Sequence, residues 1–351
     1  MIDFRYHLVS LISVFLALAV GIVLGAGPLR DTIGETLTGQ VQDLRVDRER
    51  LRAELEASEV AVGERNDFIE GTAPVVLEDL LPGRTVALVT LPGTEDEAVE
   101  TVRARLDQAG AVVIGEVAVT EEWSDPEDAS FRDTFSGQLL GHLAPAPEEE
   151  ATTAEILGTS LGQALTGIGN GGLDDGTSED SAATLLEMLV SAEVPLVTVT
   201  SEPTELADAT VLIGPPPQEP VEESETPDAE AEATAAEERA AHVELAMALA
   251  EAGEGSVTVG AAENPEDLVA VVRGDGSADD AVTTVDSVGA VTAGVSAPMA
   301  LAVAMSGSHG HFGSELDAEE PVPPHSPLPE DEVGATGDDD AAGDGDPAGD
   351  G

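Results

Sequence analysis

Residues 8–27 constrain the chain more than any other stretch. This segment, LVSLISVFLALAVGIVLGAG, has no charged residue, and its only polar side chains are Ser10 and Ser13. A helix of about 20 residues is roughly 30 Å long, which matches the hydrocarbon core of a bilayer. Backbone groups inside lipid must bond to one another, so such a segment is helical. We therefore predict a transmembrane anchor at 8–27, preceded by a short N-terminal segment, 1–7.

Two other interpretations of this segment are a buried core helix and a cleaved signal peptide. A core helix of a soluble protein would show a polar stripe, and this segment has none. A cleaved signal has an apolar core of about 7–15 residues followed by a small-residue cleavage site. Here the apolar core is longer, and Pro28 directly follows the small residues at 25–27. We expect the anchor to be retained.

The charges that flank the anchor favour one orientation. Arg5 and the terminal amine precede it, whereas Arg30 follows it. Acidic residues count little in the positive-inside rule, so the excess of one amine favours a cytoplasmic N-terminus. We expect a single-pass protein of the cell membrane whose body lies outside the cytoplasm.

Two blocks of the sequence resemble a known family. Residues 4–29, FRYHLVSLISVFLALAVGIVLGAGPL, are similar to the N-terminus of the actinobacterial copper transporter family. Residues 283–313, TTVDSVGAVTAGVSAPMALAVAMSGSHGHFG, resemble its C-terminal block, which begins with TVD. The blocks have the family's order and separation, although they cover less than a fifth of the chain. The resemblance implies membrane association and a role in copper transport or homeostasis.

The charge of the chain excludes some partners. Its formal net charge is −58, from 71 acidic and 13 basic residues. Nucleic acid is not expected as a partner, because phosphate binding needs a basic face. The lipid bilayer is expected as a partner of the anchor, without wide contact to anionic headgroups. The chain has no cysteine, which excludes disulfides, thiolate metal sites and cysteine nucleophiles.

A heptad pattern follows the anchor and predicts a coiled coil over 37–70. Apolar residues recur at alternating steps of four and three for more than four heptads, which is typical of a coiled-coil seam. We expect Gly71 and Pro74 to end this helix. The alternative is a single amphipathic helix that lies on its own globular domain. The ten seam positions are Leu37, Val41, Leu44, Arg48, Leu51, Leu55, Ser58, Val62, Arg65 and Ile69.

The charges in this pattern favour a homodimer. Arg48 occupies an a position when Leu44 is d, and a lone charged a residue favours dimers over larger assemblies. In a parallel dimer, Asp47 faces Arg52 of the second copy, which is attractive. Residue 54 would face residue 59, and because both are glutamates this second pair is repulsive, so the charge pairs alone give a mixed signal.

The segment 84–314 predicts an extracytoplasmic α/β domain. Continuous apolar runs alternate with helical patterns, which indicates a Rossmann-like, largely parallel sheet covered on both faces. A Pro- and Glu-rich insertion at 215–232 and an acidic tail at 315–351 are expected to be disordered. Thr234 and Glu237 have the spacing of a capping box for the helix after the insertion. Strands are expected at 85–90, 111–119, 196–200, 210–214, 256–260, 268–272 and 282–285, and helices at 95–108, 152–165, 181–191, 235–252 and 296–305.

Two motifs match enzyme signatures only formally. Gly158–Gly162 fits G-x-S-x-G, but a nucleophile elbow needs a strand before Ser160, and TTAEILG is helical in pattern. We interpret the two glycines as flanking a small residue at a helix break. Gly167, Gly169 and Gly172 fit G-x-G-x-x-G, yet a helix precedes them and two carboxylates follow, which would repel phosphate. We interpret these glycines as a flexible loop and predict that the chain is not an enzyme.

The best candidate copper ligands lie close together near the end of the domain. His309 and His311 bracket a glycine, with Met299 and Met305 nearby in sequence. Imidazole suits Cu(II) and thioether suits Cu(I), so copper is the metal expected here. Two histidines at i and i+2 of an extended segment would point the same way. The alternative is that both methionines pack in the core and that 311–313 forms a terminal turn.

These observations lead to two functional hypotheses. The first is a membrane-anchored envelope protein of the copper transporter family, acting in copper homeostasis. The second is a non-catalytic scaffold that recruits cell-wall or division proteins of the envelope through its coiled coil and α/β domain. Stoichiometric copper on the purified protein would favour the first hypothesis.

Overall fold

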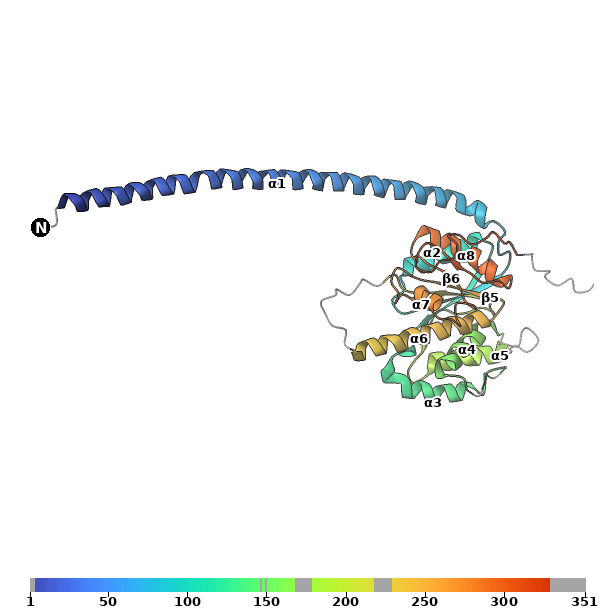
Figure 1. The fold of residues 1–351 in the computed structure, drawn as a ribbon. Coiled ribbons are helices and arrows are strands. Elements are labelled where there is room, and N and C mark those ends of the chain that lie inside the picture. Colours follow the sequence, from blue (N-terminus) through green and yellow to red (C-terminus); the bar gives the residue numbers. More distant parts are fainter. Residues whose placement is uncertain (1–3, 146, 149, 168–178, 218–228, 329–351) are drawn as a thin grey trace, which may run out of the picture. The chain divides into compact units, whose positions relative to one another are not determined.

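The computed structural model describes residues 4–145, 147–148, 150–167, 179–217 and 229–328, without the side chains of 26–39, 179, 229 and 230 (Figure 1). It divides into two compact units, 1–67 and 68–351. The long helix α1, Phe4–Leu77, supplies the first unit and enters the second.

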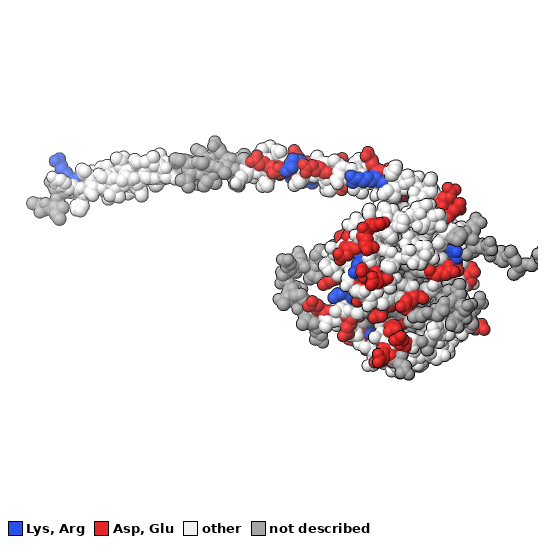
Figure 2. Space-filling model, turned by 45° about the vertical axis from the view of Figure 1, so that its right-hand side comes forward, with Lys and Arg blue, Asp and Glu red and all other residues white. Residues whose placement is uncertain are grey.

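The first unit begins with an apolar part of α1. Phe4–Gly25 is, within the described residues, the one helical stretch long and apolar enough to cross a membrane. Its large apolar side chains are exposed, and most of the segment is white in Figure 2. The predicted N-terminal apolar helix is confirmed, whereas the coiled coil at 37–70 stays a prediction.

In the second unit, the last turns of α1 continue past the two residues that were expected to end it. Gly71 and Pro74 lie inside the helix, so that prediction is wrong. Ala73 and Leu77 are fully buried in the body, and the Thr72 hydroxyl donates to the carbonyls of Phe68 and Ile69. Burial of apolar side chains stabilises these turns despite the missing proline N–H.

The body is built on a mostly parallel sheet, which confirms the predicted α/β class. Within the described residues the sheet has seven strands in the order β3-β2-β1-β4-β5-β6-β7, and only β3 pairs antiparallel, with β2. The strands are β1 (Thr85–Thr90), β2 (Val112–Val119), β3 (Val197–Ser201), β4 (Ala209–Ile213), β5 (Gly255–Val259), β6 (Thr283–Val285) and β7 (His311–Phe312).

Helices cover both faces of this sheet and enclose two apolar cores (Figure 1). On one face lie α2 (Asp96–Gln108) and α8 (Val291–Met305), together with the end of α1. The other face carries α3 (Ala129–Leu139), α4 (Thr153–Thr166), α5 (Glu179–Ser191) and α6 (Ala229–Glu251), with α7 (Leu268–Gly274) beside α6. Two short 3-10 helices, Glu121–Trp123 and Pro126–Asp128, precede α3.

Several predicted elements differ from the structure. Residues 268–272 form α7 and not a strand, because a short apolar run fits either state and its packing decides. The helix expected at 235–252 begins at Ala229, so Thr234 is inside α6 and caps nothing. The capping box is at Thr152 and Glu155, before α4. The helix expected at 296–305 begins at Val291.

Part of the predicted acidic tail belongs to the folded body. Residues 315–328 are described, and Glu315 and Leu316 hydrogen-bond to the segment after β5 through Ala262. The prediction of a disordered tail from 315 onward is therefore wrong for 315–328. Residues 329–351, and 218–228 of the predicted insertion, lie outside the described residues.

Candidate functional site

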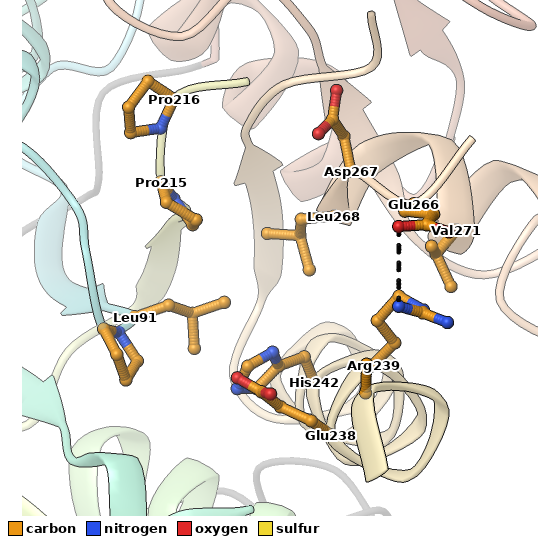
Figure 3. Close-up of a pocket in the computed structure, with 12 residues that line it drawn as sticks. Leu91, Pro215, Pro216, Glu238, Arg239, His242, Glu266, Asp267, Leu268 and Val271 are labelled. Atoms are coloured by element: carbon orange, nitrogen blue, oxygen red, sulfur yellow. Dashed lines mark ion pairs between the residues drawn. The ribbon is translucent and has the colours of Figure 1, made fainter. Parts of the chain in front are cut away.

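The sheet topology places one pocket where ligands of open α/β sheets commonly bind. From β1 the chain moves to β2 on one side, whereas β4 lies on the other side of β1. Ligands of such sheets bind outside the carboxyl ends of the strands at this switch point. Leu91 and Pro92 follow β1 there, and Pro215 and Pro216 follow β4. Together with α6 and the start of α7 they line a cavity of about 210 Å³ (Figure 3).

His242 is the most distinctive side chain of this switch-point pocket. It projects from α6, and its Nε2 atom is buried with no hydrogen-bond partner among the described residues. Burial lowers the pKa of His242 from 6.5 to about 4. The imidazole is therefore neutral at physiological pH, and a neutral imidazole is the form that binds metal ions.

The remaining polar side chains of the pocket are mostly acidic. Glu238 lies one turn before His242 on α6, and Figure 3 shows the two side chains next to each other. Arg239 and Glu266 form an ion pair at 4.0 Å across the pocket. Asp267 receives a hydrogen bond of 2.8 Å from the backbone N–H of Asn264 at the start of α7. The site therefore offers one neutral imidazole, carboxylates and a single guanidinium.

This chemistry does not suit a nucleotide. The helix after β1, α2, carries Asp96 and Glu97 in its first turn, preceded by Glu95. Carboxylates at a helix N-terminus occupy the position that a phosphate would need. The cavity of about 210 Å³ is also smaller than the roughly 300–1,000 Å³ of ordinary cofactor pockets.

A second cavity, of about 320 Å³, lies between α3, α4 and α6. Trp123 lines it, and its indole N–H has no hydrogen-bond partner among the described residues. Arg132, also in the lining, donates to the carbonyls of Glu122 and Asp125, and burial lowers its pKa. Its guanidinium is thus already engaged by the backbone.

A buried network joins the carboxyl ends of β6 and β7. Arg273 of α7 and Asp286 after β6 form an ion pair at 3.0 Å, with both side chains fully buried. Arg273 also donates to Thr284 Oγ1 and to the carbonyls of Phe312 and Leu316. Asp286 accepts from the backbone N–H groups of 314 and 315 at 3.0 and 3.1 Å. The network therefore fastens residues 311–316 to the sheet.

His311 belongs to the edge of this network. Its Nδ1 lies 2.8 Å from Thr284 Oγ1, and its Nε2 lies 3.0 Å from Asp279 Oδ1. Nε2 carries a proton in this arrangement, because a carboxylate only accepts hydrogen bonds. Neither ring nitrogen has a free lone pair for a metal ion while these two bonds are in place.

Comparison with known proteins gives the family. A sequence model of the family described as "Copper transport outer membrane protein, MctB" matches residues 1–323. The chain belongs to the MctB copper transport family. It is 27% identical over 326 residues to the copper transporter MctB of Mycobacterium bovis and, with the same values, to that of Mycobacterium tuberculosis; each alignment covers 90% of this chain and 96% of the relative. The Mycobacterium leprae copper transporter MctB is 30% identical over 165 residues, 47% of this chain and 51% of that protein.

The predicted resemblance to copper transporters is thus confirmed, and the structure shows what its C-terminal block does in this MctB family member. Thr284 and Asp286 of the TVD motif bond to Arg273. Gly313, which ends the block, has φ +136°, and a Cβ there would collide with the Asp286 carboxylate. These residues of the block hold the sheet edge together.

The structure does not gather the four predicted copper ligands into one group. His309 is exposed, whereas His311 is buried and hydrogen-bonded, so the two histidines do not share an orientation. Met299 is buried in the core under α8, and Met305 packs against the same core. No group of three His, Asp or Glu side chains within the described ranges could hold a metal ion. Copper ligation by these residues stays a prediction.

The two formal enzyme motifs have structural roles. Ser160 is fully buried in the middle of α4 and donates to the carbonyl of Ile156 at 2.6 Å. Its flanking glycines lie against α6, where a Cβ on Gly158 or Gly162 would come within 2.8 or 2.7 Å of an alanine Cβ. The predicted helix break is therefore wrong, since the glycines permit close helix packing. Gly167 caps α4 in the left-handed conformation, and Gly169 and Gly172 lie outside the described residues.

Sequence reasoning missed His242 and Arg273. The ends of the predicted strands at 85–90 and 210–214 could have indicated the switch-point pocket, but nothing local marks His242 as part of it. Arg273 directly follows the apolar run LVAVV, which suggests that it is buried too. A buried guanidinium needs a carboxylate partner. Asp286 of TVD was available as that partner.

Proposed function

We propose that this chain is a single-pass, membrane-anchored protein of the cell envelope that takes part in copper transport or homeostasis. The match of the MctB family to residues 1–323 carries this proposal. The name of the relatives, copper transporter, supports the copper role, and the apolar helix at Phe4–Gly25 supports the anchor. The strand order further supports a Rossmann-like body.

We propose that the N-terminus is cytoplasmic and that the body lies outside the cytoplasm. The chain has no cysteine, so a single introduced cysteine reports its own location. His309 is an exposed position of the body. In spheroplasts with an intact cytoplasmic membrane, a membrane-impermeant maleimide should label the His309→Cys protein. Labelling only after lysis would overturn this orientation.

We further propose that copper, as cargo, is contacted by imidazole nitrogens. His309 is exposed, and His242 is held neutral in the switch-point pocket. Because the described residues contain no preformed group of three ligands, each imidazole is expected to contact copper weakly and exchangeably. Such a site suits transfer of an ion better than permanent storage.

Copper titration of the full chain in detergent tests this proposal. We expect saturable binding that His242→Ala or His309→Ala weakens at least tenfold, with His7→Ala as a control outside the body. Fluorescence of Trp123, the one tryptophan, checks that each body remains folded. Only weak, salt-sensitive uptake, as expected of a carboxylate-rich surface, would overturn direct binding.

The second candidate function is a non-catalytic envelope scaffold. It is favoured by the exposed apolar side chains of α1 between 41 and 62, which offer a surface for other proteins. The burial of Ser160 inside α4 supports the absence of catalysis at that motif. Unchanged copper tolerance after gene deletion, together with defects in cell shape or separation, would favour this function over the first.

A further inference from the structure

The part of α1 between residues 41 and 62 carries apolar side chains that nothing in the described chain covers. Exposed fractions are 41% for Val41, 67% for Leu44, 57% for Leu51, 60% for Leu55 and 47% for Val62. Leu44, Leu51 and Leu55 line a shallow, open hollow of about 360 Å³. Their spacings of three, seven, four and seven keep them on one face of the helix. We call this face the α1 seam.

Charged side chains beside the seam differ in whether they have partners. Arg50, on the outer side of the helix, pairs with Asp47 at 3.4 Å and with Glu54 at 3.2 Å. Arg48 and Arg52 line the hollow itself, and neither forms an ion pair among the described residues. The seam therefore presents a leucine-lined surface with two guanidinium groups available to a partner.

We propose that the partner on the α1 seam is a second copy of this chain, parallel and in register over residues 41–62. In the heptad with Leu44 at d, Asp47 of each copy lies at g and faces Arg52 at e of the other. This attractive pair occurs twice and supplies a carboxylate for each unpaired Arg52. Arg48 at an a position disfavours larger bundles, because two guanidinium groups can leave the interface for water whereas more cannot easily do so.

The direction of the second helix follows from the anchor. This step rests on the proposed membrane anchoring and not on the proposed copper role. Two copies anchored in one bilayer by Phe4–Gly25 have α1 leaving the membrane in the same direction. Glu54 and Glu59 repel in this arrangement, so we expect a dimer of moderate affinity that co-localisation in the membrane favours.

Single-cysteine crosslinking tests the proposal on the full chain, which has no native cysteine. Ser58→Cys places a thiol at a d position, facing its equivalent in a parallel dimer, whereas Ala57→Cys is at c on another side of the same turn. Both original residues are small and exposed. Under mild oxidation in membranes, we expect at least tenfold more disulfide-linked dimer from Ser58→Cys than from Ala57→Cys.

Two further variants keep the test decisive. Adding Leu51→Glu to Ser58→Cys should abolish the crosslink, while adding Ala53→Glu at the outer f position should retain it. Unchanged Trp123 fluorescence shows that the body is folded in every variant. Equal crosslinking at 57 and 58, no crosslinking at 58, or a crosslink that survives Leu51→Glu would each overturn the parallel dimer. If the α1 seam binds this chain's own body or a different protein, no crosslink should form at residue 58.

Discussion

The first unit and the body differ in the solvent exposure of their apolar side chains. In the body, large residues such as Leu88, Leu161 and Leu301 are completely buried in two cores on either side of the sheet. Along the parts of α1 whose side chains are described, Phe4–Gly25 and 40–62, residues of the same types are exposed. The body therefore has the interior that a self-contained fold requires, whereas these parts of α1 present the apolar surface that is typical of a binding face or a membrane contact.

Charges show the same contrast. Arg50 on α1 pairs with two carboxylates at the surface, where solvent and salt weaken the attraction. Arg273 and Asp286 pair in the interior, where Arg273 also donates hydrogen bonds to the carbonyls of Phe312 and Leu316. Acidic side chains also predominate over the face of the body shown in Figure 2. Mutations of one type should consequently have very different effects in the two regions.

The largest difference is expected between Arg273→Met and Arg50→Met. The first variant leaves the Asp286 carboxylate buried without its partner, which should lower the free energy of unfolding by about 3–5 kcal/mol. Arg50→Met should leave the body's stability within about 0.5 kcal/mol of the original. Denaturant unfolding followed by Trp123 fluorescence measures both, because Trp123 lies in the body. Similar midpoints for the two variants would contradict the role of the buried network.

A matched pair of leucines tests the contrast in packing. Leu301→Ala creates a cavity in the core under α8 and should destabilise the body by about 2–5 kcal/mol. Leu51→Ala removes an exposed side chain of the α1 seam and should not move the Trp123 transition. It should instead weaken the Ser58→Cys crosslink described above. A loss of body stability in Leu51→Ala would show that the seam packs on the body.

His242 gives the body a pH dependence of known sign. Folding lowers its pKa to about 4, so below pH 6.5 the unfolded chain binds a proton that the folded chain does not. Stability is thus lost as the pH falls from about 6.5 towards 4, by about 2 kcal/mol at pH 5. His242→Gln should flatten this part of the profile, measured as the Trp123 midpoint in denaturant from pH 7.5 to 5. A variant profile as steep as the original would rule out His242 as its source.

Glycine-to-alanine substitutions should have opposite signs in the two regions. On α4, a Cβ at Gly162 would lie 2.7 Å from that of Ala252, so overpacking outweighs the gain in helix propensity. We expect Gly162→Ala to cost the body about 1–2 kcal/mol. Gly63 of α1 has open space around it, and Gly63→Ala should stabilise its helix by up to about 1 kcal/mol. Thermal melts followed by Trp123 fluorescence for the body and by far-ultraviolet circular dichroism for helix content distinguish the two effects.

Strong local patterns allowed much of the fold to be predicted. The apolar helix and the runs that form β1, β2, β4 and β5 were identifiable because the spacing of the apolar residues and the residue types indicate the same secondary structure there. The run at 268–272 was not, since five apolar residues fit a strand or a helix equally well. Leu268 lies close against Gly214 and Gly260 in the structure, and that packing is invisible in the sequence.

The candidate site was much less predictable than the fold. Sequence proximity suggested that His309 and His311 act together, but β7 buries one and leaves the other exposed. His242 is distant in sequence from the loops after β1 and β4 that complete its pocket. Only the strand order, which no local pattern encodes, places them together.

The two ends of the body are held to each other. The backbone N–H of Leu328 donates to the carbonyl of Leu80 at 3.0 Å, and Leu328 packs against the core that contains Leu80. Leu80 is synthesised long before Leu328, so this hydrogen bond forms only after almost all of the described body has been made. The body therefore gains this closing contact only after residue 328 has been synthesised, so its first and last described elements become one folded unit late.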